Sequence, residues 1–397
     1  RFPEADRLDH VLQQDGPTPP SVQGLMQGLA RYLAAFQSQA AVAGEDSAFG
    51  RPEDVMAFAR DNIESLQATL TDPGDRERVQ ALGGWTETQF TRLAPLMAQR
   101  RTGGRVREGH GDLHLANLVR IGDAVMAFDG IEFNDALRWI DVASDIAFTW
   151  MDLRRIGRGG LGNLLLSEWL DASGDVSAPA VLPFFAVYRA LVRAKVAGIR
   201  MAQAGADVAA SLAEVRAYLA LANEIARPPA PQLLITHGLS GSGKTWAATR
   251  WLAAQAAPAI RLRSDVERKR LHGLAALAAS GSGLNTGLYS PQAHGDTYAS
   301  LLARSRELLD QGWSVLVDAA FLRRHERAAF ATLAAERGVP CHILACEAPP
   351  DELRRRIRAR QAAGGDASEA TLAVLEQQFG WLEPLDAAER ARCVTPE

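Results

Sequence analysis

One segment constrains the fold of this chain more than any other: Gly238-Leu239-Ser240-Gly241-Ser242-Gly243-Lys244-Thr245. It matches the pattern G-x-x-x-x-G-K-[ST] in full. An apolar stretch, 233–237, precedes it, and residues with helical spacing follow it. This context predicts a strand, a glycine-rich turn and a helix, which together begin a parallel α/β sheet.

The residue types in this segment are those needed to hold phosphate. Glycines let successive backbone N–H groups turn toward one anion, and the following helix directs its positive end at the same point. A lysine here reaches the β- and γ-phosphates of ATP, and the next hydroxyl binds Mg²⁺. Lys244 is one of three lysines among 43 basic residues, which argues against the alternative of a glycine-rich turn with a chance Lys-Thr pair. The expected phosphate-binding residues are Gly238, Ser240, Gly241, Ser242, Gly243, Lys244 and Thr245.

The periodicity of the sequence changes near a proline-rich stretch. Residues 1–226 have mostly helical spacing, interrupted by a hairpin over 117–128 with Gly122-Asp123 as its turn. Residues 227–232 read as a linker. Over 233–397 short apolar strands alternate with helical segments, which predicts a parallel sheet flanked by helices. The expected strands after the first are 259–263, 315–318, 341–345 and a short last one near 392–397.

Carboxylates at two strand ends are candidates for chemistry. Asp265 follows the second strand, where it could take the proton of an attacking hydroxyl. Arg268 would share its helical face and hold an anionic group of the acceptor. Asp318 ends the strand Val315-Leu316-Val317-Asp318, at a position suited to magnesium. The simpler alternatives are that Asp265 caps a helix and that Asp318 is an ordinary strand end.

A run of arginines follows, with five in the eight residues 353–360. Arginines on a closing lid would neutralise charge on a transferring phosphoryl group. We expect Arg356 and Arg360, four residues apart, to face inward. A solvated face with salt bridges accounts for others of the five.

The C-terminal motifs carry a family resemblance. The GLSGSGKT loop, the RSDVER segment, VLVDA and R-I-x-x-R resemble the AAA-type predicted kinases, which are related to gluconate kinases, zeta-toxin-like kinases and polynucleotide 5′-kinases. The resemblance covers about 233–397 and implies transfer of phosphate from ATP to a hydroxyl. Asp265 and Arg268 match the D-x-x-R of the polynucleotide kinases. The acceptor stays open between a small metabolite and a nucleic-acid end.

A second motif lies in the N-terminal part. In His110-Gly111-Asp112-Leu113-His114-Leu115-Ala116-Asn117 the Asp and Asn have the spacing of a kinase catalytic loop, and Asp129 follows the hairpin. With 141–147, these segments resemble the C-lobe of aminoglycoside phosphotransferase-like proteins, and the module order resembles bacterial fusions with a P-loop kinase. The resemblance implies that Asp112 is the catalytic base, that Asn117 and Asp129 bind metal, and that Asp145 braces the loop.

This second resemblance is incomplete. Such kinases need an N-lobe with a lysine for the ATP phosphates, but no lysine precedes Lys195 and the residues before His110 cannot supply a five-stranded sheet. We therefore expect most of the N-lobe to be absent from this chain. The module is then either active or retained as an inactive scaffold or substrate-binding part.

Composition narrows the class of protein. The net charge of −4 argues against general nucleic-acid or membrane-surface binding, and no apolar run reaches transmembrane length. Three cysteines without metal spacing favour a reducing cytoplasm. We expect the tryptophans to lie in cores. Three functions stay open: a C-terminal kinase using ATP and Mg²⁺, a small-molecule phosphotransferase in the N-terminal module, and a nucleotide-regulated scaffold.

Overall fold

The computed structural model describes residues 2–13, 20–44, 46–278, 288, 290–363 and 367–395. The chain divides into two compact units. The first comprises Arg1–Trp169 and Asp175–Pro228, and the second comprises Leu170–Gly174 and Pro229–Glu397. Each unit is described here by itself.

The first unit is mostly helical, as the periodicity predicts. Its long helix α8 packs against α3, α6 and α9, and together they bury an apolar core that includes Phe148, Trp150 and Phe184. Among the described residues, the helices up to the linker are α1 (Leu8–Leu12), α2 (Pro20–Gln39), α3 (Pro52–Thr69), α4 (Pro73–Thr102), α5 (Asp135–Arg138), α6 (Val142–Arg155), α7 (Gly159–Ser173), α8 (Ala178–Met201) and α9 (Val208–Ala226), with the short 3₁₀ turns η1 (Glu4–Asp6) and η2 (Leu115–Asn117).

Two antiparallel strand pairs interrupt these helices. The predicted hairpin is confirmed as β2 (Leu118–Ile121) and β3 (Ala124–Ala127), and Gly122 in its turn has a φ of 62°. The second pair, β1 (Val106–Glu108) with β4 (Trp139–Asp141), is absent from the sequence analysis. Each of its strands has three residues, which is too short to show a period of two.

The second unit is built on the predicted parallel sheet, which is confirmed. Its strands are β5 (Leu233–His237), β6 (Ala259–Arg263), β7 (Ser314–Asp318), β8 (Cys341–Ala345) and β9 (Cys393–Val394). They lie in the order β6-β7-β5-β8-β9, and all neighbouring pairs are parallel. The first strand of the unit is therefore central, and successive connections leave it toward opposite edges. This is the arrangement in which ligands bind at the carboxyl ends of strands.

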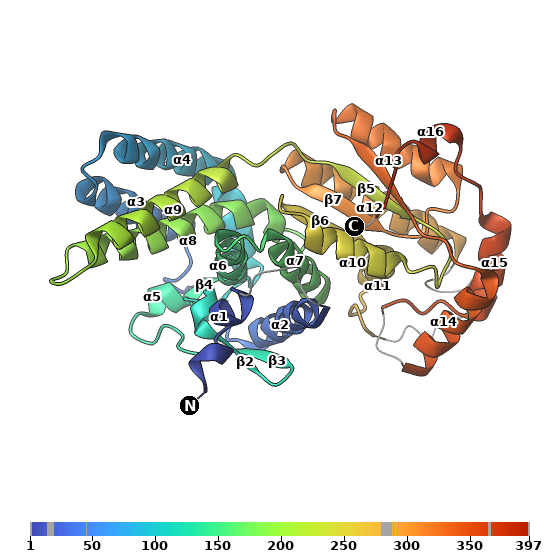
Figure 1. Ribbon diagram of the computed structural model, residues 1–397, viewed down its shortest axis with the longest axis horizontal. Helices are drawn as coiled ribbons and strands as arrows, with labels where there is room; N and C mark the ends of the chain where they lie inside the picture. The colour runs from blue at the N-terminus through green and yellow to red at the C-terminus, as the bar shows by residue number, and fades with distance from the viewer. Residues whose placement is uncertain are drawn as a thin grey trace. The chain divides into compact units, whose positions relative to one another are not determined.

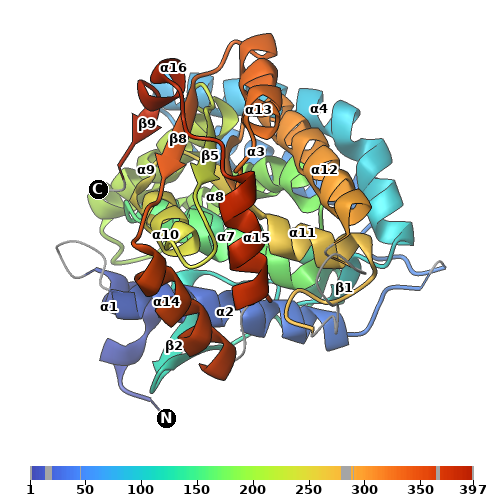
Figure 2. The same ribbon diagram turned by 90° about the vertical axis from the view of Figure 1, so that its right-hand side faces the viewer.

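Helices cover both faces of this sheet. Figure 1 shows α10 and α13 on opposite faces of the strands, and α12 contacts β7. The helices described in this part are α10 (Lys244–Ala254), α11 (Ser264–Leu271), α12 (Pro291–Asp310), α13 (Arg324–Glu336), α14 (Pro350–Ala363), α15 (Leu372–Trp381) and α16 (Ala387–Arg390). In Figure 2, α14 and α15 lie near each other at the end of the unit that faces the viewer, and their contact is apolar.

The tryptophan prediction is only partly correct. Trp150, Trp169 and Trp313 are buried, but Trp246 is 61% exposed. Trp246 lies two residues after Lys244, in the first turn of α10, where the adjoining cavity keeps its ring open to solvent. Within the described part of the chain, no helix combines the length and apolarity needed to cross a membrane.

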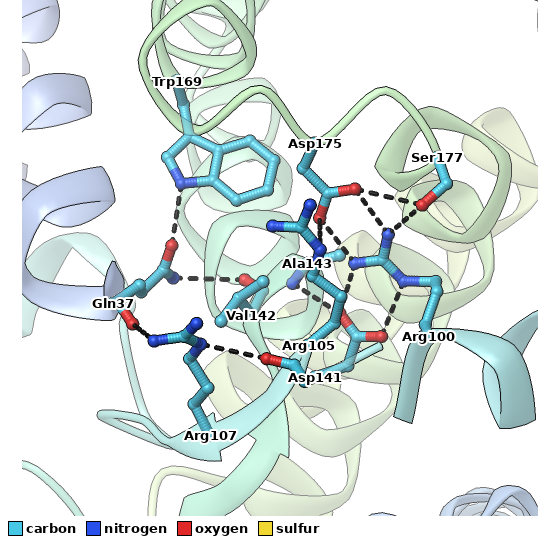
Figure 3. A network of polar contacts seen from close by, with 11 residues as sticks. Gln37, Arg100, Arg105, Arg107, Asp141, Val142, Ala143, Trp169, Asp175 and Ser177 are labelled. Carbon is cyan, nitrogen blue, oxygen red and sulfur yellow. Dashed lines mark hydrogen bonds and ion pairs between the residues drawn. The ribbon is translucent and has the colours of Figure 1, made fainter. Parts of the chain in front are cut away.

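A buried ion network holds the first unit together. Arg100 on α4 donates from Nε and Nη2 to the carboxylate of Asp141, and from Nη1 and Nη2 to the carboxylate of Asp175 (Figure 3). Asp141 also caps α6 by accepting from the Ala143 amide. Burial alone would lower the pKa of Arg100, but the two carboxylates raise it well above its usual range.

This network predicts a large effect of Arg100→Met. The substitution leaves two buried carboxylates without their cation, so the free energy of unfolding should fall by about 3–5 kcal/mol at pH 7. Burial would raise the pKa of Asp175, but Arg100 keeps it below the ordinary value of 3.8. This stabilisation is therefore present above that pH and lost as the pH falls through the folded-state pKa, so the gap between variant and wild type should shrink in acid.

Urea unfolding at several pH values measures the difference in the free energy of unfolding between wild type and the Arg100→Met variant. Arg60→Met is a matched control, because Arg60 makes the same two-bonded pair with Glu87 on the exposed surface. Surface pairs of this kind contribute little. An Arg100 variant as stable as the control would contradict the assigned role of the buried network.

Candidate functional site

The loop 238–245 connects the central strand β5 to α10 and has a backbone that only glycine tolerates at three positions. The φ angles of Gly238, Gly241 and Gly243 are 145°, 85° and 96°. A Cβ on Gly238 would lie 2.2 Å from the carbonyl oxygen of Cys346, and one on Gly241 would lie 2.9 Å from that of Leu353. The loop is therefore shaped by both its own torsions and its close contact with the chain after β8.

Polar groups of this loop have definite partners. The Lys244 Nζ donates to the Leu239 carbonyl at 2.7 Å, and the Ser240 amide donates to Gln378 Oε1 at 2.8 Å. Burial lowers the pKa of Lys244, although the negative charges of Asp318 and Asp265 oppose this shift. Lys244, the predicted catalytic Asp265 and the predicted magnesium ligand Asp318 line the same cavity.

These residues line one cavity of about 320 Å³. It contains ten of the residues singled out from the C-terminal sequence, which come from the loop, α11, the end of β7 and α14. They are Ser240, Gly241, Gly243, Lys244, Thr245, Asp265, Arg268, Asp318, Arg356 and Arg360. Gly238 and Ser242 are not part of the lining: the first is covered by the Cys346 carbonyl, and Ser242 is buried.

The two carboxylates lie at the carboxyl ends of neighbouring strands. Asp265 begins α11 directly after β6, and Asp318 ends β7, whose register pairs it with Arg263. Arg268 Nη1 donates to Asp265 Oδ1 at 3.0 Å. The structure thus places Arg268 as a partner of Asp265 itself, and the predicted contact between Arg268 and an acceptor anion stays a proposal.

The arginine run divides between the surface and the cavity. Arg354 and Arg355 pair with acidic side chains on the surface, Glu376 and Glu352. Arg356 lines the cavity, where its Nη1 donates to the Gly241 carbonyl at 3.3 Å while its Nε donates to Glu352. Arg360 also lines the cavity and donates to the Ala370 carbonyl at 3.0 Å.

The sequence analysis missed a polar group on the far wall of the cavity. His294 Nε2 lies 2.7 Å from Glu326 Oε1, and its ring packs on Tyr298 at 4.6 Å between centroids. The Tyr298 hydroxyl accepts from the Phe321 amide. His294 and Tyr298 are four residues apart on α12, so their spacing places them on one face, but nothing in the sequence marks that face as the inner one.

The residues that line the cavity can be compared with the usual ligands of Mg²⁺. Magnesium is usually bound by one or two protein oxygens together with substrate phosphates and water. The Thr245 hydroxyl and the Asp318 carboxylate line the same cavity and are oxygen donors of this kind. No group of three or more His, Cys, Asp or Glu side chains with metal-site geometry occurs in the described residues. The two oxygen donors of the cavity therefore suit a magnesium ion that is bound mainly by phosphates and water.

The second predicted site, in the first unit, has an ordered loop. Asp145 is 1% exposed, and its two carboxylate oxygens accept from the amides of His110 and Gly111 at 2.9 Å each. Asn117 Nδ2 donates to Asp112 Oδ2 at 3.1 Å. The structure therefore brings Asp112, Asn117 and Asp145 together at this loop, and their roles in catalysis stay a proposal.

The side chains around Asp112 differ in their exposure. His114 is buried, accepts from the Ala116 amide and lies 3.3 Å from the Asp112 carboxylate. Burial would raise the pKa of Asp112, but His114 and nearby arginines outweigh it and lower the pKa. Asp129 follows the hairpin, is exposed and has a φ of 60°. The residues before His110 form helices and the strand β1, so the described part contains no five-stranded N-lobe sheet.

Comparisons with known proteins agree with the C-terminal site. Residues 233–385 match the family described as AAA domain. The chain is 28% identical over 385 residues to two uncharacterized proteins, Mb2027c of Mycobacterium bovis and Rv2004c of Mycobacterium tuberculosis, a match covering 96% of this chain and 75% of each relative.

Two solved structures show weak overall similarity. One is the Mycobacterium tuberculosis APS kinase CysC in complex with AMPPNP and APS, with 22% identity over 38% of this chain and 96% of that chain and a TM-score of 0.28. The other is choline kinase from Cryptosporidium parvum Iowa II, with 11% identity over 52% of this chain and 66% of that chain and a TM-score of 0.32. The family match and the geometry of the loop show that the C-terminal part contains a P-loop domain.

The loop geometry predicts that Gly238→Ala is destabilising. The added methyl group would meet the Cys346 carbonyl and would also require a φ that alanine does not readily adopt. We expect a loss of about 2 kcal/mol or more in the free energy of unfolding of the second unit. The exposed helical glycine Gly295 has open space at its Cβ, so Gly295→Ala should instead stabilise by about 0.5–1 kcal/mol. Thermal unfolding compares the two variants, and equal midpoints would refute the constraint.

Proposed function

We propose that this protein is an ATP- and Mg²⁺-dependent kinase that moves the γ-phosphate to a hydroxyl of a small metabolite or a nucleic-acid end. In this proposal Lys244 and the amides of the loop hold the nucleotide phosphates. Thr245 and Asp318 bind magnesium, which would bridge the phosphates and offset their charge. Asp265 takes the proton of the acceptor hydroxyl.

One observation carries the proposal. A glycine-shaped loop with its lysine and two carboxylates at neighbouring strand ends line the same cavity, although they come from positions up to 74 residues apart, Lys244 to Asp318. A structural role alone would not require an ammonium group and both acids around one open space. Phosphoryl transfer requires this combination of positive charge, metal ligand and proton acceptor.

The proposed transfer of the γ-phosphate forms one bond, breaks another and moves one proton to a residue of the cavity. The acceptor oxygen forms a bond to the γ-phosphorus as the bond from that phosphorus to the β–γ bridging oxygen breaks, and ADP leaves. The proton of the acceptor hydroxyl passes to the carboxylate of Asp265. Arg268, bonded to Asp265 Oδ1, positions this carboxylate. Arg356 and Arg360 add positive charge at the wall formed by α14.

The acceptor is defined only by class. His294, Tyr298 and Glu326 line the part of the cavity beyond the phosphate loop and offer hydrogen-bonding groups to a polar molecule. The proposal places the protein in the cytoplasm, which the three unpaired cysteines, Cys341, Cys346 and Cys393, support.

The proposal predicts different failures for two substitutions. Lys244→Ala removes the cation that holds the transferring phosphate, so γ-phosphate transfer should fall by at least about 100-fold, with weaker nucleotide binding. Asp265→Asn keeps the shape but not the proton acceptor, so kcat should fall by about 10²–10⁴-fold while nucleotide affinity is retained. Transfer of labelled γ-phosphate to sugar acids, nucleosides and 5′-hydroxyl oligonucleotides measures the rate, and calorimetry with magnesium nucleotide measures the affinity.

Lys195→Ala is the control for loss of a lysine, because Lys195 pairs with Asp61 on the surface of the first unit. It should leave both measurements unchanged. Transfer that survives Lys244→Ala at the wild-type rate would remove the basis of the proposal.

A second candidate function places phosphate transfer in the first unit. The observation that favours it is the loop in which Asp145 fixes the backbone and Asn117 contacts Asp112. The lowered pKa of Asp112 keeps this carboxylate ionised at neutral pH, as an acceptor of a substrate hydroxyl proton must be.

Asp112→Asn separates the two candidates. If the C-terminal site carries the activity, this variant should transfer phosphate at a rate within about twofold of wild type, because it changes a residue of the other unit. A loss of activity in Asp112→Asn with full activity in Lys244→Ala would instead favour the N-terminal candidate. Nucleotide binding without transfer to any acceptor would favour a nucleotide-regulated scaffold.

A further inference from the structure

A buried arginine of the first unit lacks a partner. Arg189 on α8 is 4% exposed, and its Nε and Nη2 are buried without a hydrogen-bond partner. No ion pair or hydrogen bond of this side chain occurs within the described ranges of the chain. The charge of Asp112 acts on this guanidinium without forming an ion pair with it, and buried N–H donors that lack acceptors cost free energy. The guanidinium lies 5.0 Å from the ring centre of Phe148 and 5.3 Å from that of Tyr188, and these contacts offset only part of this cost.

Other buried arginines of this chain have the hydrogen-bond partners that Arg189 lacks. Arg100 uses Nε and Nη2 to bind both oxygens of Asp141, and Arg327 uses the same two atoms on Glu389. This edge of the guanidinium matches a carboxylate in geometry. In the part of the chain that the structure describes, Arg189 alone leaves both atoms of this edge buried and unpartnered. A carboxylate would satisfy both atoms of this edge at once.

Arg189 lines a cavity of about 230 Å³ that can hold such an anion. Its walls are mostly apolar and aromatic: Phe49 and Trp139 are stacked at 5.8 Å between centroids with 15° between their planes. The other walls come from α3, α5, β4, α6 and α8, and include Val55, Phe58, Leu137, Ile140, Phe185 and Tyr188. All of these residues belong to the first unit.

The remaining polar groups of the cavity make no bond to Arg189. Asp141 is committed to Arg100 and to the Ala143 amide. Asp54 is exposed, and Ser144 carries no charge. The cavity therefore combines a buried guanidinium, whose Nε and Nη2 lack acceptors, with an apolar enclosure.

We propose that this cavity binds a small organic monocarboxylate with an aromatic or aliphatic body, and that Arg189 pairs with its carboxylate. The two adjacent donors Nε and Nη2 match the two oxygens of one carboxylate, and Asp112 already offsets part of the positive charge of Arg189, which favours a monocarboxylate over a dianionic phosphate ester. An apolar cavity of roughly 150 Å³ accepts benzene, so this larger space fits one ring with a short acidic arm. The proposal goes beyond the kinase site and does not depend on it.

Matched acids and amides test the proposal on the full chain. Benzoate, phenylacetate and hexanoate are titrated by calorimetry and by ligand-observed NMR, each beside its neutral amide. We expect at least one acid to bind at least about tenfold more tightly than its amide, because only the acid offers two charged oxygens to Nε and Nη2 of Arg189. The absence of an acid-over-amide preference in all three pairs, including the absence of any binding, overturns the proposal.

Three variants assign the binding to this cavity. Arg189→Gln should abolish the preference for acids. Ala57→Trp, an exposed lining position on α3, should block the space without touching Arg189 and abolish binding of acid and amide together. Arg193→Gln is the control, because Arg193 lies one turn along α8, is not part of the lining and donates to the Tyr218 hydroxyl; it should bind the acids as wild type does.

A stability measurement keeps the test decisive if Arg189→Gln folds poorly. Arg189→Met replaces an unpaired buried cation by an apolar side chain, so its thermal midpoint without acid should equal or exceed that of wild type. Wild type should gain stability on addition of the acid, and the Met variant should not. Acid binding that survives in both Arg189→Met and Ala57→Trp would place the ligand elsewhere and refute the assignment.

Discussion

The second unit depends on one backbone constraint: the chain after β5 must bend sharply while passing within contact distance of the chain after β8. Gly238 and Gly241 are the residues at which this approach leaves no room for a side chain. The bend directs the loop amides and the start of α10 toward a single point, at the carboxyl edge of the central strand. The positions of Asp265 and Asp318 follow from the same sheet, because parallel strands end at a common edge. The cavity is thus a consequence of strand order and glycine placement.

Several arginine side chains are buried in this structure. Arg100, Arg189 and Arg327 are all almost fully buried. Arg100 and Arg327 meet carboxylates, so their charges are balanced within the fold. Arg327 also donates to the carbonyls of Phe321 and Leu322, which fixes the chain just after β7. Phe321 has a φ of 48°, an unusual value for a residue with a bulky side chain, and these bonds help to hold it there.

Much of this architecture could be predicted from the sequence, and the failures have physical reasons. The strands β5, β6 and β8 were predicted at their observed ends because short apolar runs between turn residues signal buried parallel strands. In the long helix α4, Gly83, Gly84 and Pro95 interrupt the helical pattern of the sequence, and tertiary packing holds the helix together. Local pattern also cannot report pairing between distant strands of three residues, such as β1 and β4.

The residues of the site could also be predicted only where a local sequence signal marks them. A contiguous motif reveals the phosphate loop, and strand ends reveal Asp265 and Asp318, because both signals are local. Residues such as Gln378 and Glu326 reach the cavity from segments that carry no motif, and only the fold brings them there. Arg189 illustrates the same limit, since an arginine inside an apolar helix reads as a partly exposed side chain until its surroundings are known.

The contact between Ser240 and Gln378 has a thermodynamic consequence. The amide of Ser240 already donates to a neutral oxygen on α15, and Leu239 packs against the apolar cluster Leu353, Ile357 and Leu375 that joins α14 to α15. In the proposed kinase, a phosphate oxygen would reach that amide only by displacing the glutamine, so ligand affinity and the placement of α15 would be linked equilibria. Gln378 would then compete with the ligand for the loop, and binding at the loop would affect a helix 138 residues away in sequence.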